Sequence, residues 1–71
     1  RESDDMLRFK NMRQRVEFAY ERMNIDIYYE GDYRYTVEHH SDHKIFEKLS
    51  EEQVDEVLNQ IWQELKVEKV G

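Results

Sequence analysis

The sequence contains no cysteine and no proline, and its two glycines lie in one predicted turn and at the C-terminal end. Without cysteine the chain can form neither a disulfide bond nor a thiolate metal site. The absence also fits a reducing compartment, and we expect a cytoplasmic location. No run of apolar residues approaches the length of a transmembrane helix, and no signal-peptide pattern is present, so we expect no association with a membrane.

Motifs of catalytic and cofactor sites are also missing. The sequence has no glycine-rich phosphate loop, no G-x-S-x-G turn and no Cys–His pair. Its serines and histidines show no spacing typical of a nucleophile and its base. A domain of 71 residues has little room for the dry, preorganised pocket that catalysis needs. We therefore expect a protein that is not an enzyme and binds no cofactor.

Charge is abundant and unbalanced. Charged residues make up 39% of the chain, and the formal net charge is −6. Nine aromatic residues (one Trp, five Tyr and three Phe) and clear apolar periodicity nevertheless indicate a folded domain. An acidic balance makes direct nucleic-acid binding unlikely, because such binding depends on neutralising phosphates. It leaves two alternatives, a basic protein partner or mimicry of nucleic acid.

The most clearly specified element is a helix over residues 51–67. Ser50 and Gln53 have the spacing of a capping box, and Leu49 and Val54 have the spacing of a hydrophobic staple. The apolar side chains that follow recur at helical spacing and predict a stripe that faces the core. That stripe consists of Val54, Leu58, Ile61 and Leu65, flanked by Val57 and Trp62.

A first helix is predicted over about residues 5–23, with residues 1–5 frayed and Ser3, Asp4 or Asp5 as its cap. Its apolar face consists of Phe9, Met12, Val16, Ala19, Tyr20 and Met23. Leu7 and Phe18 would lie opposite this face. They are either covered by a third element, isolated apolar residues, or a contact patch for another chain.

Arginines recur at seven-residue spacing in the same segment, at Arg8, Arg15 and Arg22. On one helix they would form a row. The row is either a solvated face balanced by acids elsewhere in the chain, or an anion- or nucleic-acid-binding surface.

Residues 24–39 predict a β-hairpin, because the apolar period changes to two on both sides of the turn at residues 30–32. Of two possible turns we prefer a three-residue loop, which pairs Ile25 with Val37 and Ile27 with Tyr35, because only this register separates apolar from polar faces. Tyrosine and arginine are enriched at binding hot spots, although strand propensity alone also explains tyrosines here. The predicted partner-binding residues of the hairpin are Tyr28, Tyr29, Tyr33 and Arg34.

A histidine-rich segment follows at residues 39–43. His39 and His43 are candidate metal ligands, with Glu38 or Asp42 as an additional oxygen ligand, although the spacing matches no established motif. The alternatives are solvent-exposed or structural histidines, or a pH-sensitive contact.

Residues 44–49 are compatible with a strand or a helical turn, and we predict a strand with Ile45 or Phe46 in the core. The expected fold is a single α+β domain in the order α–β–β–(β)–α. Both helices pack on one face of a short antiparallel sheet. The other face carries Tyr28 and Arg34, and also Phe46 if Ile45 is the core residue, and it stays open. The predicted core comprises Phe9, Met12, Val16, Tyr20, Ile25, Ile27, Tyr35, Val37, Leu49, Val54, Leu58, Ile61, Trp62 and Leu65.

Small size, strong charge and a tyrosine-rich hairpin favour a protein-binding module, an inhibitor or regulatory subunit that occludes a partner's surface. A homodimer would use an uncovered sheet face or edge equally well. The second hypothesis is an acidic nucleic-acid mimic that blocks a basic groove. Its carboxylates would be Asp26, Glu30, Asp32, Glu38, Asp42, Glu47, Glu51, Glu52, Asp55 and Glu56.

Overall fold

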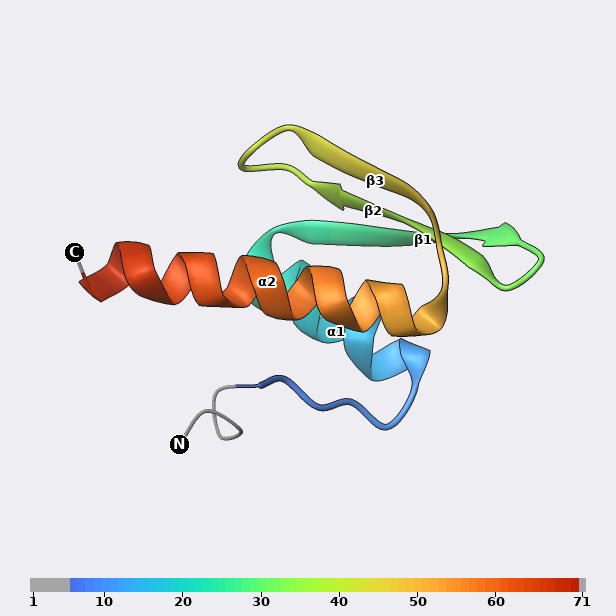
Figure 1. The fold of residues 1–71 in the computed structure, drawn as a ribbon, viewed down its shortest axis with the longest axis horizontal. Helices are drawn as coiled ribbons and strands as arrows, with labels where there is room; N and C mark the ends of the chain where they lie inside the picture. The colour runs from blue at the N-terminus through green and yellow to red at the C-terminus, as the bar shows by residue number, and fades with distance from the viewer. Residues whose placement is uncertain (1–5, 71) are drawn as a thin grey trace.

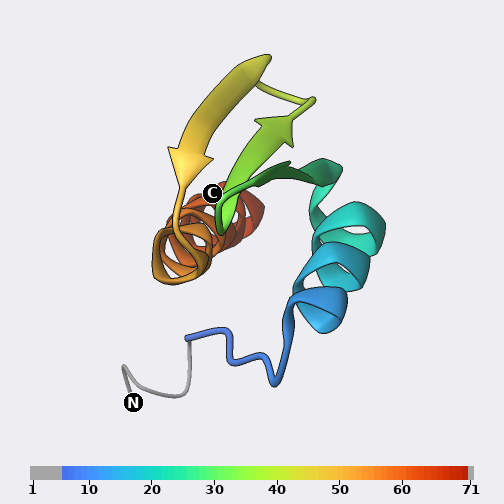
Figure 2. The ribbon, with the colours of Figure 1, turned by 90° about the vertical axis from the view of Figure 1, so that its right-hand side faces the viewer.

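The computed structural model describes residues 6–70, and the side chains of residues 6–65. The elements in chain order are α1 (Met12–Met23), β1 (Ile25–Gly31), β2 (Arg34–His39), β3 (Lys44–Leu49) and α2 (Glu51–Val70). The three strands form one antiparallel sheet in the order β1-β2-β3 (Figure 1). Both helices lie on the same side of this sheet (Figure 2), so the predicted α+β fold and its third strand are confirmed.

α1 begins later than predicted, at Met12 instead of near residue 5. Asn11 caps the helix, because its side chain accepts a hydrogen bond of 2.9 Å from the Gln14 N–H. The Gln14 side chain in turn accepts from the Lys10 N–H at 3.0 Å, which fixes the chain entering the helix. The C-terminal end matches the prediction, since Asn24 adopts the left-handed conformation (φ 57°) typical of a helix terminus. The caps predicted at Ser3, Asp4 or Asp5 lie outside the described residues.

The hairpin register differs from the prediction by two residues. Ile25 lies opposite His39, Ile27 opposite Val37, and Tyr29 opposite Tyr35. The reason is the turn, because a bulge at Gly31 (φ 96°) precedes a two-residue turn of Asp32 and Tyr33 that both have positive φ. A shift of two residues leaves each side chain on its predicted face, so the separation of faces is as expected.

α2 begins as predicted. The Ser50 N–H donates to the Gln53 side chain at 2.9 Å, and the Gln53 N–H donates to the Ser50 hydroxyl at 3.2 Å. These reciprocal bonds are the capping box expected from the sequence. The helix runs to Val70, which is beyond the predicted end at residue 67.

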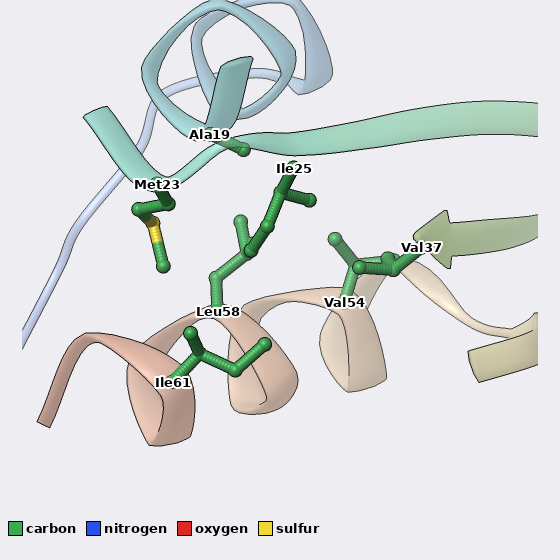
Figure 3. Close-up of a cluster of buried hydrophobic side chains, with 7 residues drawn as sticks. All are labelled: Ala19, Met23, Ile25, Val37, Val54, Leu58 and Ile61. Atoms are coloured by element: carbon green, nitrogen blue, oxygen red, sulfur yellow. The ribbon is translucent and has the colours of Figure 1, made fainter. Parts of the chain in front are cut away.

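The core lies between the sheet and the helices (Figure 3), and its buried residues are Ala19, Met23, Ile25, Val37, Val54, Leu58 and Ile61. The inward face of α1 differs from the predicted one: Met12 and Val16, predicted in the core, are only partly buried and are not among the residues that pack against it. Tyr20 was placed in the core but is 67% exposed, because α1 turns Arg15, Ala19 and Met23 inward instead. Of the two residues of β3 that were candidates for the core, Phe46 packs against it opposite Val37, while Ile45 points outward.

Candidate partner-binding surface

The face of the sheet that points away from both helices is uncovered (Figure 2). Because side chains alternate along a strand, the neighbours of the buried residues Ile25 and Val37 point to this outer face. The register places Asp26 opposite Glu38 and Tyr28 opposite Thr36. Ile45 lies beside Glu38 on β3. With Tyr28 46% exposed and Ile45 57% exposed, apolar surface on this face is interspersed with carboxylates.

The end of the β1–β2 hairpin projects beyond both helices (Figure 1). Tyr29 is 61% exposed and Tyr33 is 83% exposed. The Tyr29 ring packs on Tyr35, with 5.2 Å between the ring centroids, and its hydroxyl accepts from the Tyr33 N–H at 3.3 Å. Tyr33 itself sits at a left-handed turn position (φ 58°) with its side chain in solvent. The hairpin end therefore presents aromatic rings that the fold does not bury.

Four titratable side chains form a connected group on the outer face. His40 Nε2 lies 2.6 Å from a carboxylate oxygen of Asp26, and His40 Nδ1 lies 3.8 Å from Glu38. The Tyr28 hydroxyl donates to Glu38 at 3.5 Å. The hydrogen bond to Asp26 raises the pKa of His40, because it favours the charged imidazolium. Partial desolvation and the nearby charges of Asp26 and Glu38 raise the pKa of Tyr28.

A hollow of about 510 Å³ lies on the outer side of the hairpin end, beside the end of β3. Arg34 lines it together with Glu30, Glu47, Lys48 and Thr36. The side chains that line it carry charges of both signs or a hydroxyl, and none of them belongs to a hydrophobic residue. Arg34 therefore stands among carboxylates, and this hollow lacks the apolar walls typical of a small-molecule site.

Leu7 and Phe18 do not form a patch on one helix, because Leu7 lies before α1. Both are half-buried and pack against the core. The Leu7 backbone makes hydrogen bonds in both directions with the Asn59 side chain on α2. Phe18 is edge-on to Phe9 at 5.6 Å and to Trp62 at 5.3 Å. Of the three interpretations of these residues, the structure favours cover by another part of the chain.

The arginine row predicted on α1 is not formed. Arg8 precedes the helix, and Arg15 is only 7% exposed. Arg15 holds Asp55 through two hydrogen bonds of 2.6 and 3.0 Å and Glu51 through one of 2.8 Å. These carboxylates, Asp55 first, raise the pKa of Arg15. Arg22 stands 6.0 Å from the centre of the Phe18 ring. The central member of the row thus joins α1 to α2.

The histidines of residues 39–43 occupy three different environments. His39 points into the core side and is 3% exposed, with Nδ1 3.5 Å from Asp42 and no hydrogen bond of good geometry. His40 pairs with Asp26, and His43 is exposed in the turn with φ 58°. Among residues 6–65, no three His, Cys, Asp or Glu side chains are grouped as a metal site would need. The structure therefore does not unite His39 and His43 with further ligands.

Three contacts, one on the outer face of the sheet and two between α2 and the N-terminal part of the chain, were not predicted from the sequence. The Asp26–His40 pair depends on a register that differs by two residues from the predicted one. The Arg15–Asp55 pair and the Leu7–Asn59 clamp join residues 40 and 52 positions apart, and no local pattern reveals such partners. The one signal in the sequence was that Arg15 stands four residues before Ala19, which was predicted on the apolar face of the helix.

No protein family, curated protein sequence or solved structure matches this chain. Within the part of the chain that the structure describes, neither helix combines the length and apolar character needed to cross a membrane. Inferences about function therefore start from the chain's own surface.

Proposed function

We propose that the chain is a non-enzymatic protein-binding module, which acts as an inhibitor or regulatory subunit by covering a surface of its partner. The observation that carries this proposal is the hairpin that projects past both helices with Tyr28, Tyr29 and Tyr33 between 46% and 83% exposed. A tyrosine ring buries a large area while its side chain loses little conformational entropy, which makes tyrosine an effective anchor at interfaces.

The partner is a protein with a basic surface. Around the tyrosines, the outer face and the hairpin end carry Glu30, Glu38 and Glu47, and the whole chain has a formal net charge of −6. Complementary charge would steer such a partner to this face and fix its orientation. Lysine or arginine side chains of the partner would lie beside these carboxylates, and apolar groups would contact Tyr28 and Ile45.

Mimicry of nucleic acid is less well supported. A mimic needs an array of free carboxylates, yet Glu51 and Asp55 are bound to Arg15, and Asp26 is bound to His40. Three of the carboxylates that the hypothesis requires are thus already paired within the chain. Those pairs reduce the negative potential along α2 and β1.

The test compares three baits in extracts of the cells that express the protein. They are the unchanged protein, the Tyr28→Ala/Tyr33→Ala double variant, and Tyr20→Ala as a matched control. Tyr20 is 67% exposed, a value between those of Tyr28 and Tyr33, but it lies on α1. We expect a partner that the unchanged protein and the control capture, and that the double variant captures at least tenfold less.

Salt separates the two hypotheses. An interface anchored by aromatic rings should persist at high ionic strength, whereas binding by a mimic should fall steeply. The proposed surface would be refuted if the double variant captured as much partner as the unchanged protein. It would also be refuted if Tyr20→Ala reduced capture as much as the double variant does. Capture that only high salt abolishes would support the mimic instead.

A further inference from the structure

The sheet has two edges, and the part of β1 that precedes its bulge at Gly31 is less protected than β3. β3 carries Lys44 and Lys48, and its pairing with β2 is interrupted by a bulge where Lys48 adopts φ 58°. Lysines and bulges on an edge strand discourage another strand from pairing with it. β1 has neither lysine nor proline, and its register with β2 is regular from Ile25 to Tyr29.

The backbone groups at the free edge of β1 follow from the ladder. The His40 N–H donates to the Asn24 carbonyl at 3.1 Å, in register with the pairs of the hairpin. Because bonded and non-bonded pairs alternate in an antiparallel ladder, Asp26 and Tyr28 bond to β2, and Ile27 and Tyr29 point their N–H and C=O groups outward. The outward N–H and C=O groups of Ile27 and Tyr29 have no hydrogen-bond partner among residues 6–65.

This part of the edge is accessible. Ile25, the first outward residue, is fully buried and marks where α1 covers the strand. Ile27 is half-buried, Tyr29 is 61% exposed, and the strand continues past the helices toward the turn (Figure 1). A short extended segment therefore has room to pair with Ile27 and Tyr29.

We propose that an extended segment of the partner adds to the sheet as a fourth strand along β1, with lysine or arginine side chains alternating with apolar ones. This inference rests on the proposed protein-binding function and specifies how the partner is held. On the outer face the added basic side chains lie beside Glu30, because Asp26 is already held by His40, and on the other face the apolar ones lie beside Ile27 and Tyr29.

A second copy of the chain fits this edge poorly. Full antiparallel overlap of β1 with its copy would be centred on Tyr28. Asp26 would then lie opposite Glu30 of the copy, and this contact would occur twice. Like charges that face each other across two strands are destabilising. In this register the charge pattern of β1 favours a basic segment over self-association.

The probe is a hexapeptide of alternating lysine and valine whose two ends carry no charge. It is titrated into isotopically labelled protein, and binding is followed by amide NMR and hydrogen exchange. Its controls are a peptide of the same composition with lysines and valines in two blocks, and the alternating peptide with N-methylated valines. We expect new protection of the Ile27 and Tyr29 amides, while the Asp26 and Tyr28 amides, already bonded to β2, keep theirs. N-methylation should weaken binding about tenfold or more, since each lost hydrogen bond contributes on the order of one such factor.

A matched pair of charge variants tests the recognition of the basic side chains. Glu30→Gln should weaken binding of the alternating peptide severalfold. Glu64→Gln, which changes an exposed acid further along α2, should leave that binding unchanged.

Each contrary result has a distinct meaning. Strand addition would be overturned if the N-methylated peptide, or the peptide with lysines and valines in two blocks, bound as well as the alternating one. Protection of amides other than those of Ile27 and Tyr29 would also overturn it. Neither result would bear on the binding role of the exposed tyrosines. Protection of Ile27 and Tyr29 in concentrated protein without peptide, together with a dimeric mass, would overturn the choice of occupant. The proposed function itself fails only if the tyrosine variants still capture the partner.

Discussion

Removal of the Asp55 carboxylate tests the contact that joins the two helices. In the structure Arg15 is 7% exposed, and two of its three charged hydrogen bonds go to Asp55. Asp55→Ala would leave the buried guanidinium with Glu51 as its acceptor. We expect the free energy of unfolding to fall, because a buried charge that loses its partner is not fully rehydrated.

The magnitude follows from the two lost bonds. Hydrogen bonds to charged groups contribute about 1.5–3 kcal/mol each. The Asp55 side chain is 34% exposed, so water screens part of this interaction and offsets some of the loss. We therefore expect a decrease of about 2–3 kcal/mol, a large fraction of the roughly 4–11 kcal/mol that a domain of this size possesses. The corresponding fall in Tm is about 10–20 °C.

Urea unfolding followed by the fluorescence of Trp62 would measure this decrease. The informative comparison is with Arg15→Met, which removes the buried charge itself and leaves two carboxylates that water can reach. Arg15→Met should therefore destabilise less than Asp55→Ala, and adding it to Asp55→Ala should restore part of the loss. A change below about 0.5 kcal/mol for Asp55→Ala, or a larger effect of Arg15→Met, would contradict this account of the pair.

Four further changes probe other parts of the structure. Ser50→Ala removes the acceptor of the capping box and should lower the free energy of unfolding by about 1 kcal/mol in a urea titration; no change would mean that the cap is not formed. Leu58→Ala opens a cavity at a fully buried position and should lower it by about 2–5 kcal/mol. Tyr33→Gly relieves a left-handed residue with an exposed side chain and should raise Tm slightly, and a fall would show that the ring stabilises the turn. Protonated His40, whose pKa Asp26 raises, contributes stability below about pH 6.5, which is lost as pH rises through the raised pKa. The Tm of the unchanged protein should therefore fall as pH rises through this range, and this fall should be absent in His40→Gln. The same fall in both proteins would show that His40 is not its source.

Local signals in the sequence predicted the elements well. The capping box at Ser50, the change from helical to strand period after Asn24, and the alternation through Tyr29 are patterns that short-range interactions decide. The structure forms each of them where expected. The start of α1 was misplaced because several residues can cap a helix, and the choice of Asn11 is tied to the docking of the preceding segment on α2.

Long-range partners were not predictable from the same signals. The orientation of α1 follows from Arg15 reaching two carboxylates on α2, which turns Tyr20 to solvent. The register of the hairpin follows from positive φ at Asp32 and Tyr33, where neither residue is the glycine that such positions favour. The outer-face group of Asp26 and His40 depends on that register. The candidate surface was therefore only partly recognisable, through its tyrosines.

The strand order β1-β2-β3 equals the order along the chain, and this has a consequence for how the protein folds. Each strand pairs with its neighbour through a short turn, so the sheet assembles by closing small loops. The contacts between distant segments, Arg15 with Asp55 and Leu7 with Asn59, close loops of 40 and 52 positions and come later. We expect changes in the hairpins to alter mainly the folding rate, and changes at the helix–helix contact to alter mainly the unfolding rate. Under native conditions the segment before α1 would be the first part to detach.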